Sequence, residues 1–306
     1  MNSFKALVKR EYWEHRGSFV YAPLIMAGIF LGIILITILT GNNVEVNNNG
    51  VILSEAGTLV HEKLLSLPDE ARGQLMLTFF AGLTVSFGIV LLVVSVFFCL
   101  GSLYDERKDR SILFWKSLPI SDSATVLSKF IAIVLLAPLL YLAVIIAFQL
   151  VFLIIATISA WFGGHSGSLY WTSVNLFGFF FNKGFSMFVA ALWLSPVWAW
   201  CMLMSAWAKK VPFIWAAFPI LMIALAEGYI FGSISFIETL GNHVAAGITI
   251  QNEVFEAIKD NGHEIAELNF NRAGEAVMTL QFWIAQVIAA VFLIAAIYTR
   301  RFRDES

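Results

Sequence analysis

The densest group of residues able to bind a partner is a charged run followed by an apolar, aromatic stretch. Residues 105–110 read DERKDR, and residues 112–118 then supply apolar and aromatic side chains before Pro119. A short amphipathic helix bounded by charge can dock in a groove on another protein. The alternative is a solvated hairpin whose charges only fix topology. The residues expected to take part in docking are Asp105, Glu106, Arg107, Lys108, Arg110, Phe114, Trp115, Leu118 and Pro119.

Motifs for catalysis fit poorly. His263, Glu264 and Glu267 give H-E-x-x-E, with Glu where the metalloprotease motif has its second His. His165 lies beside Ser166 in a Gly-rich stretch, but no acidic partner is evident. The phosphate-binding pattern G-x-x-x-x-G-K-[ST] is missing, since Gly-Lys does not occur in the chain. We therefore expect no catalytic residue, metal or cofactor in this chain, and no enzyme activity of its own.

The elements that must position these residues are long apolar stretches. Hydrophobic residues make up 59% of the chain and charged residues 13%. About 20 apolar residues suffice for a helix to cross a bilayer, and continuous apolar segments in lipid must be helical to satisfy their backbone groups. The sequence predicts an all-α integral membrane protein, with a single transmembrane domain over residues 1–306. The expected spans are about 19–39, 79–100, 130–158, 184–207, 213–231 and 280–298.

The basic residues between the spans predict the orientation. They concentrate in the N-terminal segment, in the loop 101–129, around Lys209 and in the C-terminal segment, whereas few, including Arg72 and Lys183, fall in the other loops. Cytoplasmic loops carry the excess of Lys and Arg. We therefore expect both termini and the loop 101–129 to be cytoplasmic.

The segments outside the spans carry helical patterns. Residues 2–16 predict an interfacial amphipathic helix on the cytoplasmic leaflet. The outer loops 40–78 and 233–279 are acidic, and their apolar spacing, from Val51 onward in the first loop, predicts a helical cap. Ser121 is a good N-cap for the helix that leads into the third span.

Polar and small residues inside the spans suggest a pathway and helix contacts. Glu227 is the one clear ionisable candidate, and we expect it to line the pathway near the outer gate or to contact a helix; an ion-coupling role is the alternative. Gly28 with Gly32, and Gly228 with Gly232, are small-xxx-small pairs, for contact within the chain or with a second copy. The prolines expected to kink or open spans are Pro23, Pro138, Pro196 and Pro219.

The loop between the second and third spans resembles that of a known family. Glu106 and Arg107 near the end of the second span precede Ser117-Leu118-Pro119-Ile120-Ser121, and Lys129 enters the third span. This pattern, with the six spans and the N-terminal interfacial helix, resembles the permease subunits of type-2 ATP-binding-cassette (ABC-2) exporters. The chain departs from the family in its long outer loop after the first span and in the Arg110-Ser111 pair, where a Gly-containing step is commoner.

The resemblance implies a membrane permease whose cytoplasmic loop carries a coupling helix that docks on an ATPase. It implies two copies of a separate ABC ATPase subunit, which bind ATP and Mg, and a second permease copy or homologue. The spans are rich in Phe, Trp and Leu, so we expect a hydrophobic or amphipathic cargo. The expected location is a bacterial plasma (inner) membrane, with no nucleic-acid partner. The alternatives are a membrane scaffold or mechanotransmitter that binds a periplasmic partner at its outer cap, and an ion-coupled transporter that uses Glu227.

Overall fold

The computed structural model describes residues 2–40, 42–47, 50–55, 66–117, 119–162, 164, 166–171, 176–252 and 272–302. Among them, six helices are long and apolar enough to span a membrane, which confirms the predicted helical, multi-pass class. The elements in chain order are α1 (Asn2–Glu14), η1 (Gly17–Tyr21), α2 (Ala22–Thr40), β1 (Asn42–Asn47), β2 (Gly50–Glu55), α4 (Asp69–Ser102), α5 (Tyr104–Lys108), α6 (Ser111–Ser117), α7 (Asp122–Ile131), η2 (Ala132–Leu136), α8 (Ala137–Phe162), η3 (Gly167–Tyr170), α9 (Leu176–Trp193), α10 (Ser195–Trp207), α11 (Pro212–Phe231), α12 (Ser235–Gln251), α14 (Arg272–Met278) and α15 (Leu280–Phe302).

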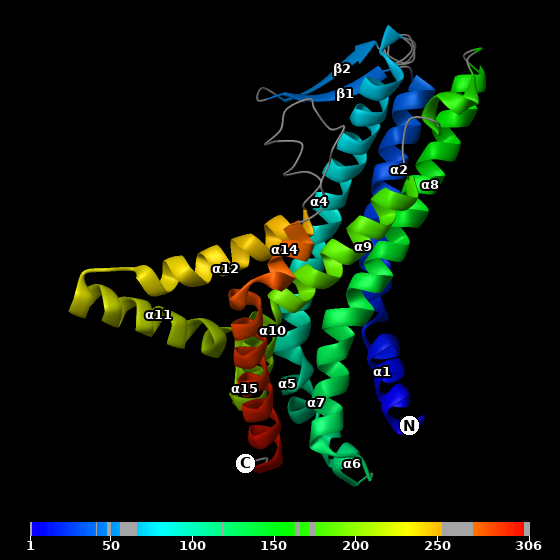
Figure 1. The fold of residues 1–306 in the computed structure, drawn as a ribbon. Coiled ribbons are helices and arrows are strands. Elements are labelled where there is room, and N and C mark those ends of the chain that lie inside the picture. Colours follow the sequence, from blue (N-terminus) through cyan, green and yellow to red (C-terminus); the bar gives the residue numbers. More distant parts are fainter. Residues whose placement is uncertain are drawn as a thin grey trace.

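The long helices α2, α4 and α8 form one part of an elongated bundle, and α10 packs on both α4 and α15 (Figure 1). One end of the bundle holds α1, α5, α6, the first turns of α7 and the last turns of α15; we call this end the base. The hairpin of β1 and β2 lies at the opposite end. The N-terminal helix, the 101–129 segment and the end of the last span therefore lie together.

Two prolines follow widened helical turns. The Ala22 N–H donates to the Gly17 carbonyl, five residues back, and Pro23 comes next. The same arrangement over Ala132–Leu136 precedes Pro138. Proline has no N–H and its ring clashes with the carbonyl four residues back, so a π turn at this place spares the helix that clash. Both helices thus continue past their proline.

The fourth predicted span, 184–207, is not one helix. The structure has α9, a break at Leu194, and then α10, with Pro196 in its first turn. The break occurs there because Pro196 cannot donate to a carbonyl of the preceding turn. Helix α9 also begins earlier than expected, so Lys183 lies inside a candidate span and is buried, whereas the sequence placed it in an outer loop.

The expected helix from Val51 onward is wrong for the residues that the structure describes there. Strands β1 and β2 pair antiparallel, with Val46 opposite Val51. Alternating valines around an Asn- and Gly-rich turn favour a hairpin, and short apolar runs do not distinguish a helix from a strand. Helix α4 follows Pro68 and starts at Asp69, almost three helical turns before the predicted start of the second span at residue 79. Of the rest of the predicted cap, residues 56–65 and 253–271 lie outside the described residues, and the described part of the loop 233–279 contains the helices α12 and α14.

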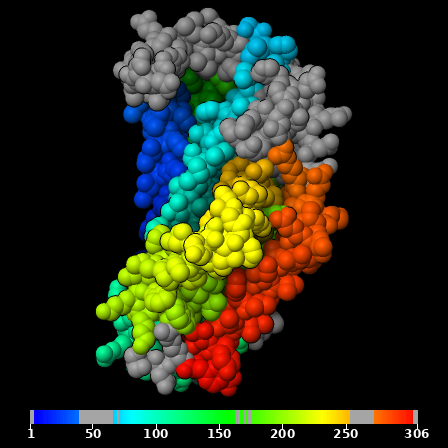
Figure 2. Space-filling view, turned by 90° about the vertical axis from the view of Figure 1, so that its left-hand side faces the viewer, coloured from blue at the N-terminus to red at the C-terminus, as the bar shows by residue number. Residues whose placement is uncertain are grey.

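Helices α11 and α12 form a hairpin that extends sideways from the bundle (Figure 1), and it projects toward the viewer in Figure 2. The fifth span was predicted at 213–231, in agreement with α11. Ala216 is the buried residue of α11, where its carbonyl accepts from Trp200 Nε1. The rest of this apolar helix is largely exposed, so lipid or another chain must cover it.

Helix α12 packs directly on the break between α9 and α10. The Trp193 Nε1–H donates to the His243 carbonyl, and the His243 ring nitrogen bonds the Trp193 carbonyl, both at 2.9 Å. Burial lowers the pKa of His243, which favours the neutral ring. A Cβ at Gly247 would lie 2.7 Å from Leu194 side-chain atoms, so only glycine allows this approach.

Side chains from three helices satisfy the carbonyls at the break. The Trp193 carbonyl bonds His243 of α12, and the Leu192 carbonyl accepts from Gln286 Nε2 of α15 at 2.9 Å. The Ala191 carbonyl accepts from Trp198 Nε1 of α10 at 3.2 Å. Because unpaired backbone groups are costly in lipid, these bonds make the break tolerable inside an apolar bundle.

Gly247→Ala is expected to destabilise the protein by about 1–3 kcal/mol, because the new methyl group overlaps Leu194. Gly241→Ala in the same helix is the matched control, since a Cβ there meets nothing within 4 Å. Alanine is the better helix former, so the control should be neutral or stabilising by about 0.5–1 kcal/mol. Thermal unfolding of the purified protein measures both variants. Equal unfolding midpoints would contradict close packing of α12 on the break.

Candidate functional site

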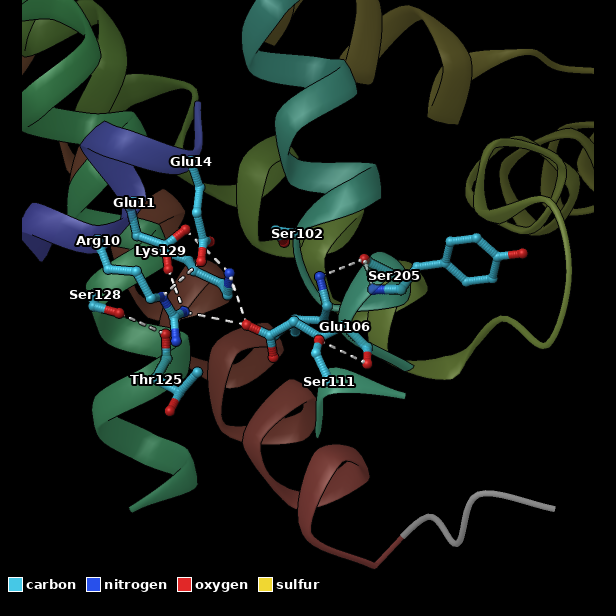
Figure 3. Close-up of polar contacts among 12 residues, drawn as sticks. Arg10, Glu11, Glu14, Ser102, Glu106, Ser111, Thr125, Ser128, Lys129 and Ser205 are labelled. Carbon is cyan, nitrogen blue, oxygen red and sulfur yellow. Dashed lines mark hydrogen bonds and ion pairs between the residues drawn. The ribbon is translucent and has the colours of Figure 1, made fainter. Parts of the chain in front are cut away.

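A buried carboxylate, Glu106 of α5, lies at the centre of the base (Figure 3). It forms ion pairs with Lys129 of α7 at 3.1 Å, with Arg300 of α15 at 2.7 Å and with Arg10 of α1 at 3.2 Å. Four helices that are distant in the sequence thus meet at one side chain. A displacement of α5 must therefore act on α1, α7 and α15 together.

Two further acids balance the three cations. Glu11 of α1 is 0% exposed and pairs with Lys129 at 3.1 Å and with Arg10 at 2.5 Å. Asp122 pairs with Arg300 at 3.1 Å. Buried charges are tolerated only when they are paired, and each of these six charges has at least one partner of opposite sign. Glu14, whose side chain is 45% exposed, adds a further pair with Arg10 at 3.5 Å. We call the six charges the base network: Arg10, Glu11, Glu106, Asp122, Lys129 and Arg300.

Arg10 also joins helix α6 to the base network. Its guanidinium lies over the Trp115 ring, 4.2 Å from the ring centroid, in a cation–π contact. Burial lowers the pKa of Arg10, but the neighbouring Glu11 charge opposes this and the net pKa is raised. Ile112 is buried on the inner side of α6, whereas Leu113 and Phe114 are 54% and 60% exposed. Helix α6 therefore has an anchored side and an open apolar side.

Arg107 binds the end of α10. Its Nη2 donates to the carbonyls of Ser205 at 2.5 Å and Ala208 at 2.8 Å. The Ser205 hydroxyl in turn accepts from the N–H groups of Leu103 and Tyr104, at 3.0 and 2.9 Å. A cation at a helix C-terminus satisfies carbonyls that have no partner within the helix. The predicted docking residue Arg107 thus holds α5 against α10.

The remaining predicted docking residues lie around α6. Asp105, Lys108 and Arg110 are exposed charges, and Pro119 is exposed after the end of α6. Arg110 has a positive φ of 57° at the turn between α5 and α6. Leu118 lies outside the described residues. The charged run therefore divides into a surface set and the inward pair formed by Glu106 and Arg107.

Glu227 shapes the turn between α11 and α12. Its carboxylate accepts from the Ser233 hydroxyl at 2.7 Å and from the Phe236 N–H at 2.9 Å. It thereby satisfies an N–H group at the start of α12, as a capping side chain does. Among the described residues, these contacts place it at the tip of the hairpin, away from the base network.

The four glycines of the predicted small-xxx-small pairs do not make close helix contacts within the described part of the chain. A Cβ at Gly28 or Gly32 would meet nothing within 4 Å, and one at Gly228 would only approach the Ser233 carbonyl, at 3.9 Å. Gly232 has a φ of +64° and ends α11 in the left-handed conformation. The α2 pair therefore lies on an open helix face, and Gly232 is a turn residue.

Glu11, Glu14 and His15 of the α1 region offer ligand atoms that lie within 4.8 Å of one another. Burial raises the pKa of Glu14 and lowers that of His15. Glu11 already has Lys129 and Arg10 as cationic partners, so little negative charge is left for a metal ion. We assign no metal to this group.

Four members of the base network were not predicted as site residues from the sequence, namely Arg10, Glu11, Asp122 and Arg300, and the buried Lys183 was placed outside the spans. Glu11 lies four residues after Leu7, and both are buried on the face of α1 that packs on α7. Because residues four apart in a helix lie on the same face, the spacing of Leu7 and Glu11 could have indicated that Glu11 is buried. Lys183 interrupts an aromatic stretch and was taken as the boundary of a span; extending the helix toward Leu176 would have placed it inside.

Comparison of the chain with protein-family models, with curated proteins and with solved structures finds no match. The function is therefore inferred from the residues and contacts of this chain.

Glu106→Gln is expected to destabilise the protein by about 3–5 kcal/mol, because it leaves buried cations without a shared carboxylate. Asp122→Asn is the control, since the Asp122 side chain is 26% exposed and has one cationic partner in the network. It should cost about 1 kcal/mol or less. Thermal unfolding in detergent compares the two. A control variant that is as unstable as Glu106→Gln would show that Glu106 is not the centre of the network.

Proposed function

We propose that this chain is the membrane permease subunit of an ATP-driven exporter of the ABC-2 type, coupled to a separate cytoplasmic ATPase. The observation that carries the proposal is the two-sided helix α6. Leu113 and Phe114 face outward from the base, whereas Trp115 lies under Arg10 of the buried network. An exposed apolar side suits a groove on a partner protein, and an anchored side suits transmission of its movement.

The base network gives a route from α6 to the spans. A push on α6 acts through Trp115 on Arg10, and from Arg10 on Glu106. Lys129 lies at the start of the long helix α7–α8, and Arg300 lies at the end of α15. Separating buried charges is costly, so these helices should move as a unit and not slide past one another.

The energy source must lie on another subunit under this proposal. The chain has no G-x-x-x-x-G-K-[ST] sequence, so ATP and Mg would bind to two copies of the ATPase. The orientation follows from the positive-inside rule, because exposed basic residues such as Lys5, Lys108 and Lys209 gather toward the base. The base would therefore face the cytoplasm.

A second permease copy or homologue is part of the proposal. Helix α11 is almost wholly exposed, and Gly28 and Gly32 leave an open face on α2. Small residues on an apolar helix allow close approach of another helix. The spans are apolar and rich in aromatic residues, which favours a hydrophobic or amphipathic cargo.

Phe114→Gln is expected to reduce the amount of ATPase that co-purifies with the tagged chain by about tenfold or more, since the outward aromatic ring is the centre of the proposed contact. Phe302→Gln is the matched control, because Phe302 is also an exposed phenylalanine near the base, at 58% against 60%. Quantitative immunoblotting and ATP hydrolysis of the complex measure the effect.

Both variants must unfold at the temperature of the unmodified chain. Unchanged ATPase binding in Phe114→Gln, or equal loss in the control, would contradict docking through α6. Arg107→Glu would be a poorer test of docking, because Arg107 holds the end of α10 and its loss would disturb the fold.

A further inference from the structure

Helix α1 has an inner and an outer face of different character. Leu7 is buried on the inner face, and Arg10 and Glu11 point from α1 toward Lys129 in the base network (Figure 3). The outer face is exposed, and at steps of four, four and three residues it carries Lys5, Lys9, Trp13 and Arg16. Residues with this spacing lie in a line along one side of a helix. We call these four residues the outer stripe.

The last member of the outer stripe lies just beyond the end of α1, where the chain is still helical. Arg16 has a φ of −57° and a ψ of −27°, which are helical backbone angles. The His15 N–H donates to the Glu11 carbonyl and the Phe19 N–H to the His15 carbonyl, both at 3.0 Å, so the helical turns continue past Arg16. The outer stripe is therefore one continuous surface.

The outer stripe carries three cations and no acid. Within the described part of the chain, the ion pairs of α1 all come from its other side, where the exposed Glu14 pairs with Arg10 at 3.5 Å. Lys5, Lys9 and Arg16 take part in none of these pairs. The outer stripe is thus a line of positive charge that is open to a partner of opposite sign.

The outer stripe ends where the first candidate span begins. That span starts at Gly17, directly after Arg16, and α1 leads into it through η1 (Figure 1). Trp13 is 54% exposed, and the Arg16 guanidinium lies 5.9 Å from the centroid of its ring. Tryptophan is enriched at the level of the lipid headgroups, and long basic side chains reach that level with their charged ends. The partner next to the stripe is therefore the bilayer surface.

We propose that the outer stripe binds the headgroups of anionic phospholipids and that this contact holds α1 against the base network. Phosphate oxygens of the lipid accept from Lys5, Lys9 and Arg16, and the Trp13 ring lies among the headgroups. Each basic side chain near an anionic surface adds to the attraction, whereas a zwitterionic lipid has a balancing positive group. The binding does not depend on the proposed export function.

The charge of the lipid reaches the base network within one turn of α1. Lys9 directly precedes Arg10, which pairs with Glu106 at 3.2 Å, and Glu11, which pairs with Lys129 at 3.1 Å. Lipid that holds the outer face of α1 therefore keeps these inner pairs together. Without that contact α1 separates more easily from α7, and separation would leave buried charges unpaired at a high cost.

The binding test uses the full chain in lipid nanodiscs without any ATPase. Ala6→Cys, at an exposed residue beside the outer stripe, provides the attachment point for a bimane dye, because Cys99 and Cys201 are buried. Quenching by brominated phosphatidylglycerol reports how much of this anionic lipid lies near α1, and brominated phosphatidylcholine is the zwitterionic reference. Phosphatidylglycerol should be enriched, and added salt should reduce the enrichment because it screens exposed charges.

Three results of this measurement would overturn the proposal. The first is equal quenching by the two lipids, and the second is an enrichment that salt leaves unchanged. The third is loss of the enrichment on addition of millimolar glycerol phosphate, because a free phosphate would then suffice and the bilayer would not be the partner.

Lys5→Gln combined with Lys9→Gln should lower the preference for phosphatidylglycerol about tenfold, since two of the three cations are lost. Lys5→Arg combined with Lys9→Arg keeps both charges and should retain the preference. Lys108→Gln combined with Lys116→Gln is the matched control, because it removes two exposed lysines of α5 and α6. An unchanged preference in the first pair, or an equal loss in the control, would refute binding at the outer stripe.

Thermal unfolding in the same nanodiscs tests the link to the base network. Phosphatidylglycerol should raise the unfolding midpoint of the unmodified chain and of the control pair, but not that of Lys5→Gln with Lys9→Gln. In pure phosphatidylcholine all three proteins should unfold at the same temperature, since the changed lysines are exposed. A midpoint of the unmodified chain that does not respond to phosphatidylglycerol would refute the link. Since no ATPase is present, failure of docking at α6 leaves these results unaffected.

Discussion

The arrangement of the base depends on the cost of burying a carboxylate. Glu106 is removed from water, and this is tolerable only because Lys129, Arg300 and Arg10 approach it from three helices. These ion pairs fix the positions of α1, α7 and α15 relative to α5. Helix α6 follows α5 directly and contacts the same arginine through Trp115, so its position is a consequence of the same ion pairs. The exposed face of α6 is therefore presented by a rigid support.

A second constraint acts in the middle of the bundle, where backbone groups cannot turn to water. Pro196 interrupts the fourth span, and the carbonyls at the break are bonded by His243, Gln286 and Trp198. Each of these side chains comes from a different helix. The break is thus also a junction that holds α12 and α15 in place, in the same way that the base network holds α1 and α7.

The helical class and the number of spans could be predicted because, in lipid, a long apolar segment satisfies its backbone hydrogen bonds by forming a helix. The roles inside the charged run 105–110 could not. Neighbouring residues on a helix point in different directions, and the partner of Glu106 in α15 lies 194 positions away. Lys183 was misplaced for a related reason: it donates to a main-chain carbonyl, that of Gln251, and no residue pattern reveals such a contact. Residues 42–55 were misread because a few valines fit both periodicities.

The π turns before Pro23 and Pro138 have an effect beyond the prolines themselves. Each adds one residue to a helical turn and so rotates everything after it by about 100° relative to what precedes it. In the third span, the helix face that carries Lys129 therefore does not line up with the corresponding face after Pro138. Removing one residue from the turn before Pro138 would turn a different set of the later side chains toward the interior and leave the charged start of the helix where it is.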